Sequence, residues 1–579
     1  MELSHLIIDT IWRPSFVFKY QELQHHLHPS SGRIGPPSWD HSFLNPRNRV
    51  DTLDTTSSRW RVDGATICGS CVYVVPLDLL PNLPPLRIML YLSDQTEYPA
   101  ALRHSLDACV GVPLRDGDAI SRLGIARHLC LALDSHCARN PDFLKQYLNL
   151  PFGSRLIFED ITPNVADMML DIERDYSVES SMKTVPSLQQ AWADIASDLW
   201  PPTVDINDLR LVRQLNEAVS LVEAPAQSSA IFKAANNSLD HLYHELRFLL
   251  SCPPHSHIMP RPLAVVTMKS AFGGKRGVVG FLLQNYQAGS LRDILPARQR
   301  AGALPNSVRL KWCRQVASAL AHLHETGTFY SDLRPDNLLL DAKESVVLCD
   351  FEQRGNWYEW CAPEILYRQY AESIRARLPA RIVNSPFDRL LKGYANSHTL
   401  SPSTCYTPAE SPIEARNRAW FALPPFARER AVVYSFGLLM YTIFEGLSNV
   451  QRNIANQFPI EPEVEFPTFR RTPEAVRKII QRCTANVPDW QVSGLQSGPS
   501  RVIRINGLLY PEAQTDLERD TPATFDTVMA YLLQFWSTEL ARAEEFLQRP
   551  EWETGGFGLN RPSLRDVVDS LESLPDGLN

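Results

Sequence analysis

Apolar and polar positions follow a helical period in one long segment of the N-terminal part of the chain. Between residues 118 and 140, apolar side chains recur every three or four positions, as at Ile120, Leu123 and Leu133. This spacing predicts an amphipathic helix. A polar, proline-rich loop is predicted at 28–60. The other predicted elements of this part are strands at 66–77 and 86–92 and helices at 100–110, 164–174 and 186–198.

The pattern changes near residue 200, where Leu199-Trp-Pro-Pro-Thr-Val interrupts the periodicity. We place a domain boundary there and expect an α+β N-terminal region at residues 1–200. Beyond it, strands come first and helices later, which is typical of a small β-rich lobe followed by a large helical lobe. The predicted strands lie at 209–215, 219–222, 229–234, 263–268 and 278–285, and the predicted helices at 239–250, 306–326 and 431–446.

Composition and charge narrow the classes of function. Of the 579 residues, 44% are hydrophobic and 21% are charged, an ordinary balance for a soluble globular protein. The net charge of −8 argues against a nucleic-acid partner. No apolar run approaches the ~18 residues that a membrane span needs. Eleven scattered cysteines and the lack of a signal peptide favour an intracellular protein, cytoplasmic or nuclear.

The strongest chemical signal lies in the polar residues of two neighbouring segments. Residues 330–340 read Tyr-Ser-Asp-Leu-Arg-Pro-Asp-Asn-Leu-Leu-Leu, and Asp-Phe-Glu follows at 350–352. Phosphoryl transfer needs a carboxylate facing the acceptor hydroxyl, and an Asn and an Asp that hold magnesium on the ATP phosphates. A polar turn between two strands is the plainer interpretation. These intervals, together with Ala362-Pro363-Glu364, make a chance match improbable.

With these motifs, residues 207–575 resemble the eukaryotic-type protein kinase domain, in a divergent form such as fungal genomes carry in number. The resemblance implies a two-lobed protein kinase-like fold, with ATP and Mg²⁺ as cofactors and a protein Ser or Thr hydroxyl as substrate. It also implies insertions near 371–425 and 489–557. For the N-terminal 200 residues we identify no such resemblance.

The resemblance assigns a role to each polar residue of the catalytic loop. Asp332 would orient the substrate hydroxyl and accept its proton. Arg334 would steady the γ-phosphate. Asn337 and Asp350 would bind Mg²⁺.

The small lobe is expected to supply the nucleotide contacts. Lys233, at the end of a predicted strand, would contact the α- and β-phosphates and be held by Glu245 of the next helix. Adenine is expected to meet main-chain groups of the connection between the lobes. The positions implied there are Leu283 as gatekeeper, Gln284, Asn285 and Tyr286 in the hinge, and Leu339 under the adenine.

Several residues depart from the family pattern. The phosphate-binding loop, at 215–222, contains no glycine, and Glu217 would repel phosphate if it pointed inward. We therefore expect weak ATP affinity. Ser331 replaces the usual arginine, and the short segment from 350 to 364 holds one phosphorylatable residue, Tyr358. The two losses together predict a domain that activation-loop phosphorylation does not switch.

Two alternatives to a protein kinase remain open. The glycine-free loop, the short segment and Glu352, which replaces a glycine, favour a pseudokinase that acts as a scaffold or regulator and binds a protein partner. A kinase of small molecules would suit the reduced platform for a peptide. The Ala-Pro-Glu motif counts against that last class, because the resemblance pairs Glu364 with Arg561 as a structural contact of protein kinases.

Overall fold

The computed structural model describes the chain from residue 59 onward, with gaps. The described residues are 59–65, 71–92, 119–159, 164–225, 227–235, 239–271, 273–353, 425–450, 466–485, 502–505, 508–511 and 561–577, besides isolated positions. They divide into two compact units. One unit holds the described residues from 59 to 252 together with 260–285, and the other holds 253–259 and the described residues from 286 onward.

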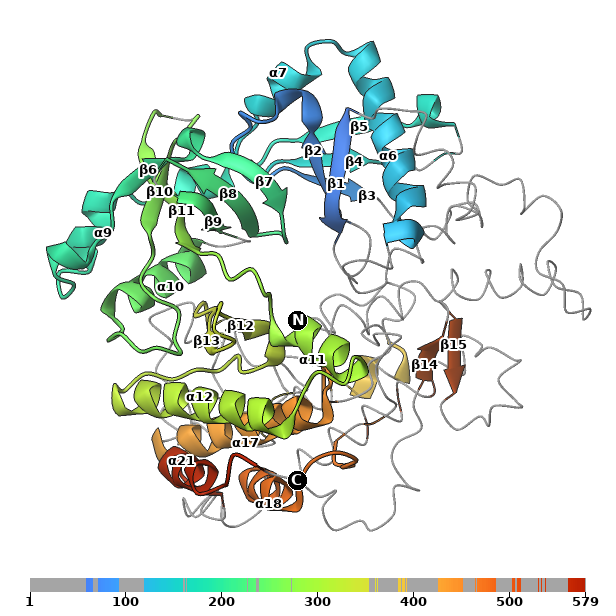
Figure 1. The fold of residues 1–579 in the computed structure, drawn as a ribbon. Helices are drawn as coiled ribbons and strands as arrows, with labels where there is room; N and C mark the ends of the chain where they lie inside the picture. Colours follow the sequence, from blue (N-terminus) through green and yellow to red (C-terminus); the bar gives the residue numbers. More distant parts are fainter. Residues whose placement is uncertain are drawn as a thin grey trace, which may run out of the picture. The chain divides into compact units, whose positions relative to one another are not determined.

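The first unit contains a sheet in which strands β1 to β5 lie in sequence order. Strands β3 and β4 pair in parallel, and the other neighbours are antiparallel. Helix α6 (Ala119–Arg139) lies beside this sheet (Figure 1) and confirms the helix predicted at 118–140. The strands are β1 Trp60–Ala65, β2 Cys71–Pro76, β3 Met89–Leu92, β4 Arg155–Phe158 and β5 Leu170–Glu173. The short helices are η1 Leu77–Leu79, α7 Phe143–Leu148, η2 Val165–Asp167, α8 Ser177–Ser181, α9 Val185–Ala191 and η3 Ser197–Leu199.

The core of this sheet joins strand and helix side chains. Leu90 and Leu156 of the strands are fully buried against Leu133 of α6. The helix predicted at 164–174 is wrong, because Leu170–Glu173 form strand β5 and only a three-residue 3-10 turn, η2, precedes it. Its residues alternate between half-buried and exposed, which is the period of a strand and not of a helix.

A second sheet in the same unit has the order β6-β10-β11-β9-β8-β7. All its neighbours are antiparallel except β6, which pairs in parallel with β10. The five strands predicted beyond residue 207 are confirmed. The three-residue β6 was not predicted, because it follows the Pro-Pro pair at 201–202. The strands are β6 Thr203–Asp205, β7 Arg210–Gln214, β8 Val219–Ala224, β9 Gln227–Ala234, β10 Ala264–Lys269 and β11 Arg276–Gln284, and η4 is Ile206–Asp208.

Helix α10 (Leu239–Ser251) completes this lobe. Most of its side chains are buried, and Tyr243 donates a hydrogen bond to the Val278 carbonyl of β11 at 2.9 Å. The helix is thereby fastened to the middle of the sheet. Residues on both sides of the boundary expected near 200 belong to this one unit, and the boundary itself stays a prediction.

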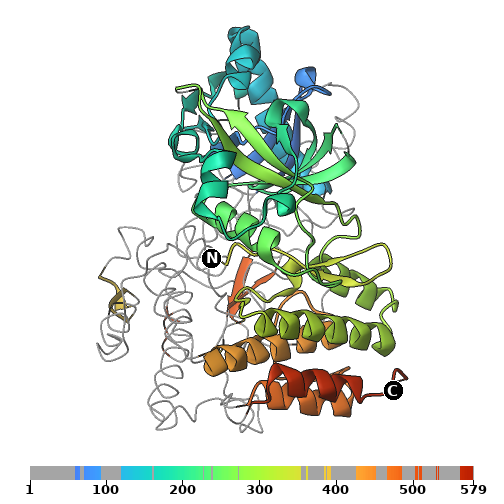
Figure 2. The same ribbon diagram turned by 90° about the vertical axis from the view of Figure 1, so that its left-hand side faces the viewer.

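The second unit is mainly helical, and Figure 2 shows its long helices stacked beside one another. Helix α17 is buried along most of its length, since apolar residues surround it on all sides. None of the described helices is long and apolar enough to cross a membrane. The elements are α11 Leu291–Arg300, α12 Asn306–Glu325, η5 Pro335–Asn337, β12 Leu338–Leu340, β13 Val346–Leu348, α17 Pro425–Glu445, α18 Glu474–Cys483, β14 Val502–Ile505, β15 Leu508–Pro511 and α21 Leu564–Glu572.

Arg561 is almost completely buried just before α21. Its guanidinium donates hydrogen bonds to the carbonyls of Ala485 and Arg430 and lies 4.9 Å from the ring centre of Tyr434. Its expected partner Glu364 lies outside the described residues, as do the helix predicted at 100–110 and most of the two insertions. The α+β fold with a β-rich and a helical lobe is confirmed.

Candidate active site

Lys233 and Glu245 form a buried ion pair within the β-rich lobe. Lys233 lies on the central strand β9, between Val219 of β8 and Phe281 of β11. Its Nζ is 2.5 Å from Oε2 of Glu245 on α10, and their side chains are 9% and 1% exposed. Loss of either partner would leave a buried charge uncompensated. The pairing expected from sequence is therefore present.

The catalytic loop brings Asp332, Arg334 and Asn337 together. A short 3-10 turn, η5, places Asn337 so that its Nδ2 donates to the main-chain oxygen of Asp332 at 2.8 Å and to Oδ2 at 2.9 Å. Arg334 Nε lies 3.2 Å from Asp332 Oδ1. Burial raises the pKa of Asp332 to about 6, although Arg334 opposes the shift. This carboxylate is held in one orientation and titrates near the pH at which a general base is effective.

Two further residues support this loop, and sequence reasoning missed both. Arg292 of α11 donates a hydrogen bond to Asp336 Oδ1 at 2.6 Å, and Arg334 lies 3.5 Å from the other oxygen. Burial opposes ionisation of Asp336, but Arg292 and Arg334 hold the pKa of this carboxyl below its usual value. Asp336 thus restrains Arg334. Its place inside the motif was a usable signal, whereas nothing local marks Arg292.

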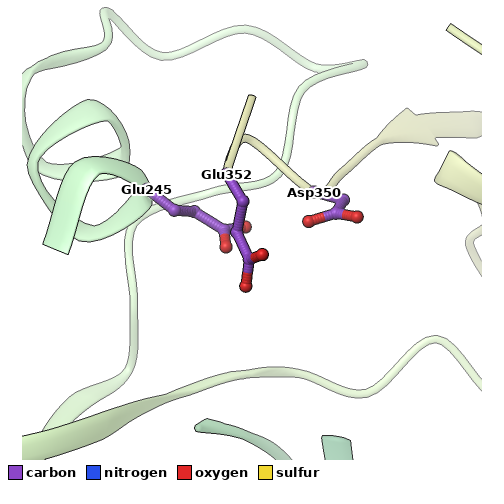
Figure 3. A group of neighbouring side chains, drawn as sticks. All are labelled: Glu245, Asp350 and Glu352. Carbon is purple, nitrogen blue, oxygen red and sulfur yellow. The ribbon is translucent and has the colours of Figure 1, made fainter. Parts of the chain in front are cut away.

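Asp350 follows β13 with a left-handed backbone, at φ 64°. The next residue, Phe351, is fully buried and packs edge-on against Tyr330, with 5.2 Å between the ring centres. Figure 3 shows Asp350 and Glu352 on this one short segment, and Glu245 on α10. Glu352 is 5% exposed. The buried Phe351 anchors the segment that carries both carboxylates.

A glutamine that sequence reasoning did not single out ties this segment to the catalytic loop. Oε1 of Gln353 accepts hydrogen bonds from the main-chain N–H and the hydroxyl of Ser331, at 2.9 and 2.8 Å. Its Nε2 donates to the carbonyl of Phe329 at 2.6 Å. Ser331 and Gln353 are both buried. Neutral hydrogen bonds therefore occupy the place where the family pattern has an arginine.

The expected adenine contacts lie on separate elements. Leu283 is buried near the end of β11, next to the exposed Gln284. Asn285 donates a hydrogen bond to the hydroxyl of Ser229 at 2.8 Å. In the helical unit, burial raises the pKa of Tyr286 to about 12. Leu339 lies there on β12, where it forms a bridge with Ser290.

In the loop between β7 and β8, several main-chain N–H groups donate hydrogen bonds to acceptors of the same loop and of Val219. The main-chain N–H groups of Leu215 and Asn216 donate to the Val219 carbonyl, at 2.9 and 3.1 Å. The N–H of Ala218 donates to Oδ1 of Asn216 at 2.9 Å. Glu217 lines a small cavity with residues of the N-terminal sheet. Three N–H groups of the expected phosphate cradle are thus already engaged within the loop.

Comparison with known proteins supports one family. Residues 229–374 match the protein kinase domain. The chain is 26% identical over 214 residues to CBL-interacting protein kinase 10 of Oryza sativa subsp. japonica, which is 37% of this chain and 38% of that protein. It is 28% identical over 172 residues to the serine/threonine-protein kinase Sgk1 of Mus musculus, which is 28% of this chain and 37% of that protein. It is 31% identical over 97 residues to the serine/threonine-protein kinase SCH9 of Saccharomyces cerevisiae, which is 15% of this chain and 12% of that protein.

Proposed function

Because this chain contains a protein kinase-like domain, we propose that it is an ATP- and Mg²⁺-dependent protein kinase that phosphorylates protein Ser or Thr hydroxyls. The observation that carries this proposal is the restrained carboxylate of Asp332. Asn337 and Arg334 hold it, and its pKa of about 6 suits a group that takes a proton at neutral pH. The kinase names of the relatives agree with this activity.

The proposed transfer forms one bond and breaks another. The hydroxyl oxygen of the substrate bonds to the γ-phosphorus of ATP, the bond from that phosphorus to ADP breaks, and the hydroxyl proton passes to Asp332. Arg334 would steady the transferred phosphoryl group. Lys233, oriented by Glu245, would hold the α- and β-phosphates.

The donor atoms of the helical unit suit a hard divalent cation. Asn337 uses its Nδ2 to hold Asp332, so its oxygen Oδ1 is the atom that would ligate a metal. Asp350 would add a carboxylate, and oxygen donors of this kind are what Mg²⁺ prefers. Bound Mg²⁺ would neutralise charge on the phosphates.

The test measures Mg²⁺-dependent ATP binding and transfer of radiolabelled γ-phosphate to a mixture of protein substrates. Asp332→Ala is expected to reduce transfer by about 10²–10⁴-fold while ATP still binds. Asp350→Ala is expected to remove the Mg²⁺ dependence of binding. Asp569→Ala, at an exposed position of α21, is the matched control and should leave both unchanged. Transfer that survives both active-site changes contradicts the proposal.

A second candidate is a pseudokinase that acts as a scaffold or regulatory module. The engaged N–H groups of the β7–β8 loop favour it, because a phosphate cradle needs such groups free. Nucleotide binding without transfer in the wild-type protein, or no nucleotide binding at all, would support this candidate.

A further inference from the structure

The N-terminal region supplies hydrogen-bond partners to strand β7, at one end of the six-stranded sheet. The N–H of Leu211 donates to the Leu83 carbonyl at 2.8 Å. The carbonyl of Val212 accepts a hydrogen bond from Nη2 of Arg61 at 2.7 Å. An end strand otherwise presents such main-chain groups to solvent or to another chain. The strand that leads into the β7–β8 loop is therefore covered from within the same chain.

A buried carboxylate of the N-terminal region also accepts a hydrogen bond from the last residue of β7, where the β7–β8 loop begins. Asp63 of β1 accepts a hydrogen bond at Oδ2 from the N–H of Gln214, the last residue of β7, at 2.7 Å. The side chain of Asp63 is 3% exposed, and its Oδ1 lies 2.5 Å from Nε of Arg61. A charge-assisted hydrogen bond in such a place is stronger than a neutral one. Arg61 and Asp63 thus act as one unit on the main chain of β7.

The tip of the loop also faces the N-terminal sheet. Glu217 lines a small cavity with Tyr73 of β2 and Arg87, a residue just before β3. Burial lowers the pKa of Arg87, and the nearby Glu217 carboxylate opposes that shift. Arg87 also donates to the carbonyl of Ala235 at 2.6 Å, two residues after Lys233. Glu217 therefore has a cationic neighbour in the N-terminal region.

The N-terminal region also forms hydrogen bonds with the half of the sheet that lies away from β7, at strand β11 and just after strand β10. Glu179 of α8 is buried and accepts hydrogen bonds from the N–H groups of Ala271 and Phe152, at 2.7 and 3.1 Å. The N–H of Val278 on β11 donates to the Lys183 carbonyl at 2.8 Å. Contacts on two sides restrain the N-terminal region relative to the sheet.

We propose that the N-terminal region, at residues 59–200, is a built-in positioning element that sets the conformation of the β7–β8 loop. Arg61, Asp63 and Arg87 are its positioning residues. Without glycine, the loop lacks the backbone freedom to follow a phosphate. Its place is instead determined by the neighbouring sheet. The positioning of the loop by the N-terminal region does not depend on the proposed function. Only the expected effect of that positioning on ATP binding rests on it.

The test uses the full-length chain and hydrogen exchange of peptides that cover residues 210–220. Asp63→Ala is expected to speed exchange there by about tenfold, because the Gln214 N–H loses a charged acceptor. Asp63→Asn keeps one neutral acceptor and should give a smaller increase. Glu217→Gln should speed exchange at the loop tip alone. Glu173→Gln removes an exposed charge from the same N-terminal sheet and should change nothing.

A second measurement separates positioning from general stability. In the Asp63 variants, exchange in α12 and the thermal unfolding midpoint are followed beside KM for ATP and kcat. Positioning of the loop predicts a several-fold change in KM with kcat nearly unchanged. Unchanged exchange at 210–220 in folded Asp63→Ala overturns the inference. Faster exchange in a protein that binds no ATP, wild type included, upholds it and contradicts the proposed function.

Discussion

At the scale of single residues, Asp332 makes the stability of the protein depend on pH. Its folded-state pKa of about 6 lies above the usual value of 3.8, because burial favours the neutral acid. The folded protein therefore binds this proton more tightly than the unfolded chain. The resulting stability is complete at low pH and is lost as the pH rises through 6.

We predict that Asp332→Asn removes this dependence. Between pH 5 and pH 8, the wild type should lose about 1.4 kcal/mol of unfolding free energy relative to the variant. Urea unfolding of both proteins across this range measures the difference. Parallel pH curves would show that Asp332 ionises as it does in an unfolded chain.

Gln353 gives a second prediction at this scale. Gln353→Leu leaves the buried N–H and hydroxyl of Ser331 without their acceptor, so we expect a loss of about 1–3 kcal/mol. The thermal unfolding midpoint and the rate of hydrogen exchange in α12, a helix of the helical unit, both measure this loss. Gln189→Leu, at an exposed position of α9, is the control. If the two substitutions lower stability equally, the hydrogen bonds of Gln353 do not stabilise the catalytic loop and the prediction is wrong.

At the scale of elements, the close approach of β9 and β11 depends on Gly280. A Cβ at this position would collide with the Lys233 carbonyl and the Phe232 ring. Gly280→Ala is therefore expected to cost about 1–3 kcal/mol and to speed hydrogen exchange in β9 and β11. Gly302→Ala has open space around it and a φ of +65°, so its cost should come from backbone strain and leave β9 unaffected. Unchanged exchange in β9 after Gly280→Ala would contradict the close packing.

Sequence periodicity predicted most elements of the β-rich lobe but not all of them. Strands β7 to β11 and helix α10 lie in the places that the sequence predicts. The sequence predicts a helix where strand β5 lies, because four residues are too few to show the period of a strand. Strand β6 has three residues, and its pairing with β10 is what makes it a strand.

At the scale of the whole molecule, the N-terminal region and the β-rich lobe form one unit. We predict that residues 1–200 and 201–579, coexpressed as two chains, purify as a complex. The chain 201–579 alone should aggregate, because β7 then exposes its main-chain groups and the buried Leu211. Size-exclusion chromatography and light scattering measure both outcomes. A soluble 201–579 chain as stable as the intact protein would contradict this prediction.

The sequence by itself determined which chemical groups are present and in what order. Asp332, Asn337 and Asp350 lie within one short stretch, and Asn337 is near enough in sequence for a single turn to bring it to Asp332. Their roles in transfer stay predictions until activity is measured. Local spacing is sufficient for Asp332 and Asn337 because one loop positions both of them.

Only the tertiary structure decided how these groups are supported. Gln353 contacts Ser331 across 22 positions, Arg292 contacts Asp336 across 44, and Asp63 contacts Gln214 across 151. Contacts of this length depend on how whole elements pack, and no local pattern records them. For the same reason, the glycine-free loop looked like a defect in the sequence, whereas in the structure it is held by a neighbouring sheet.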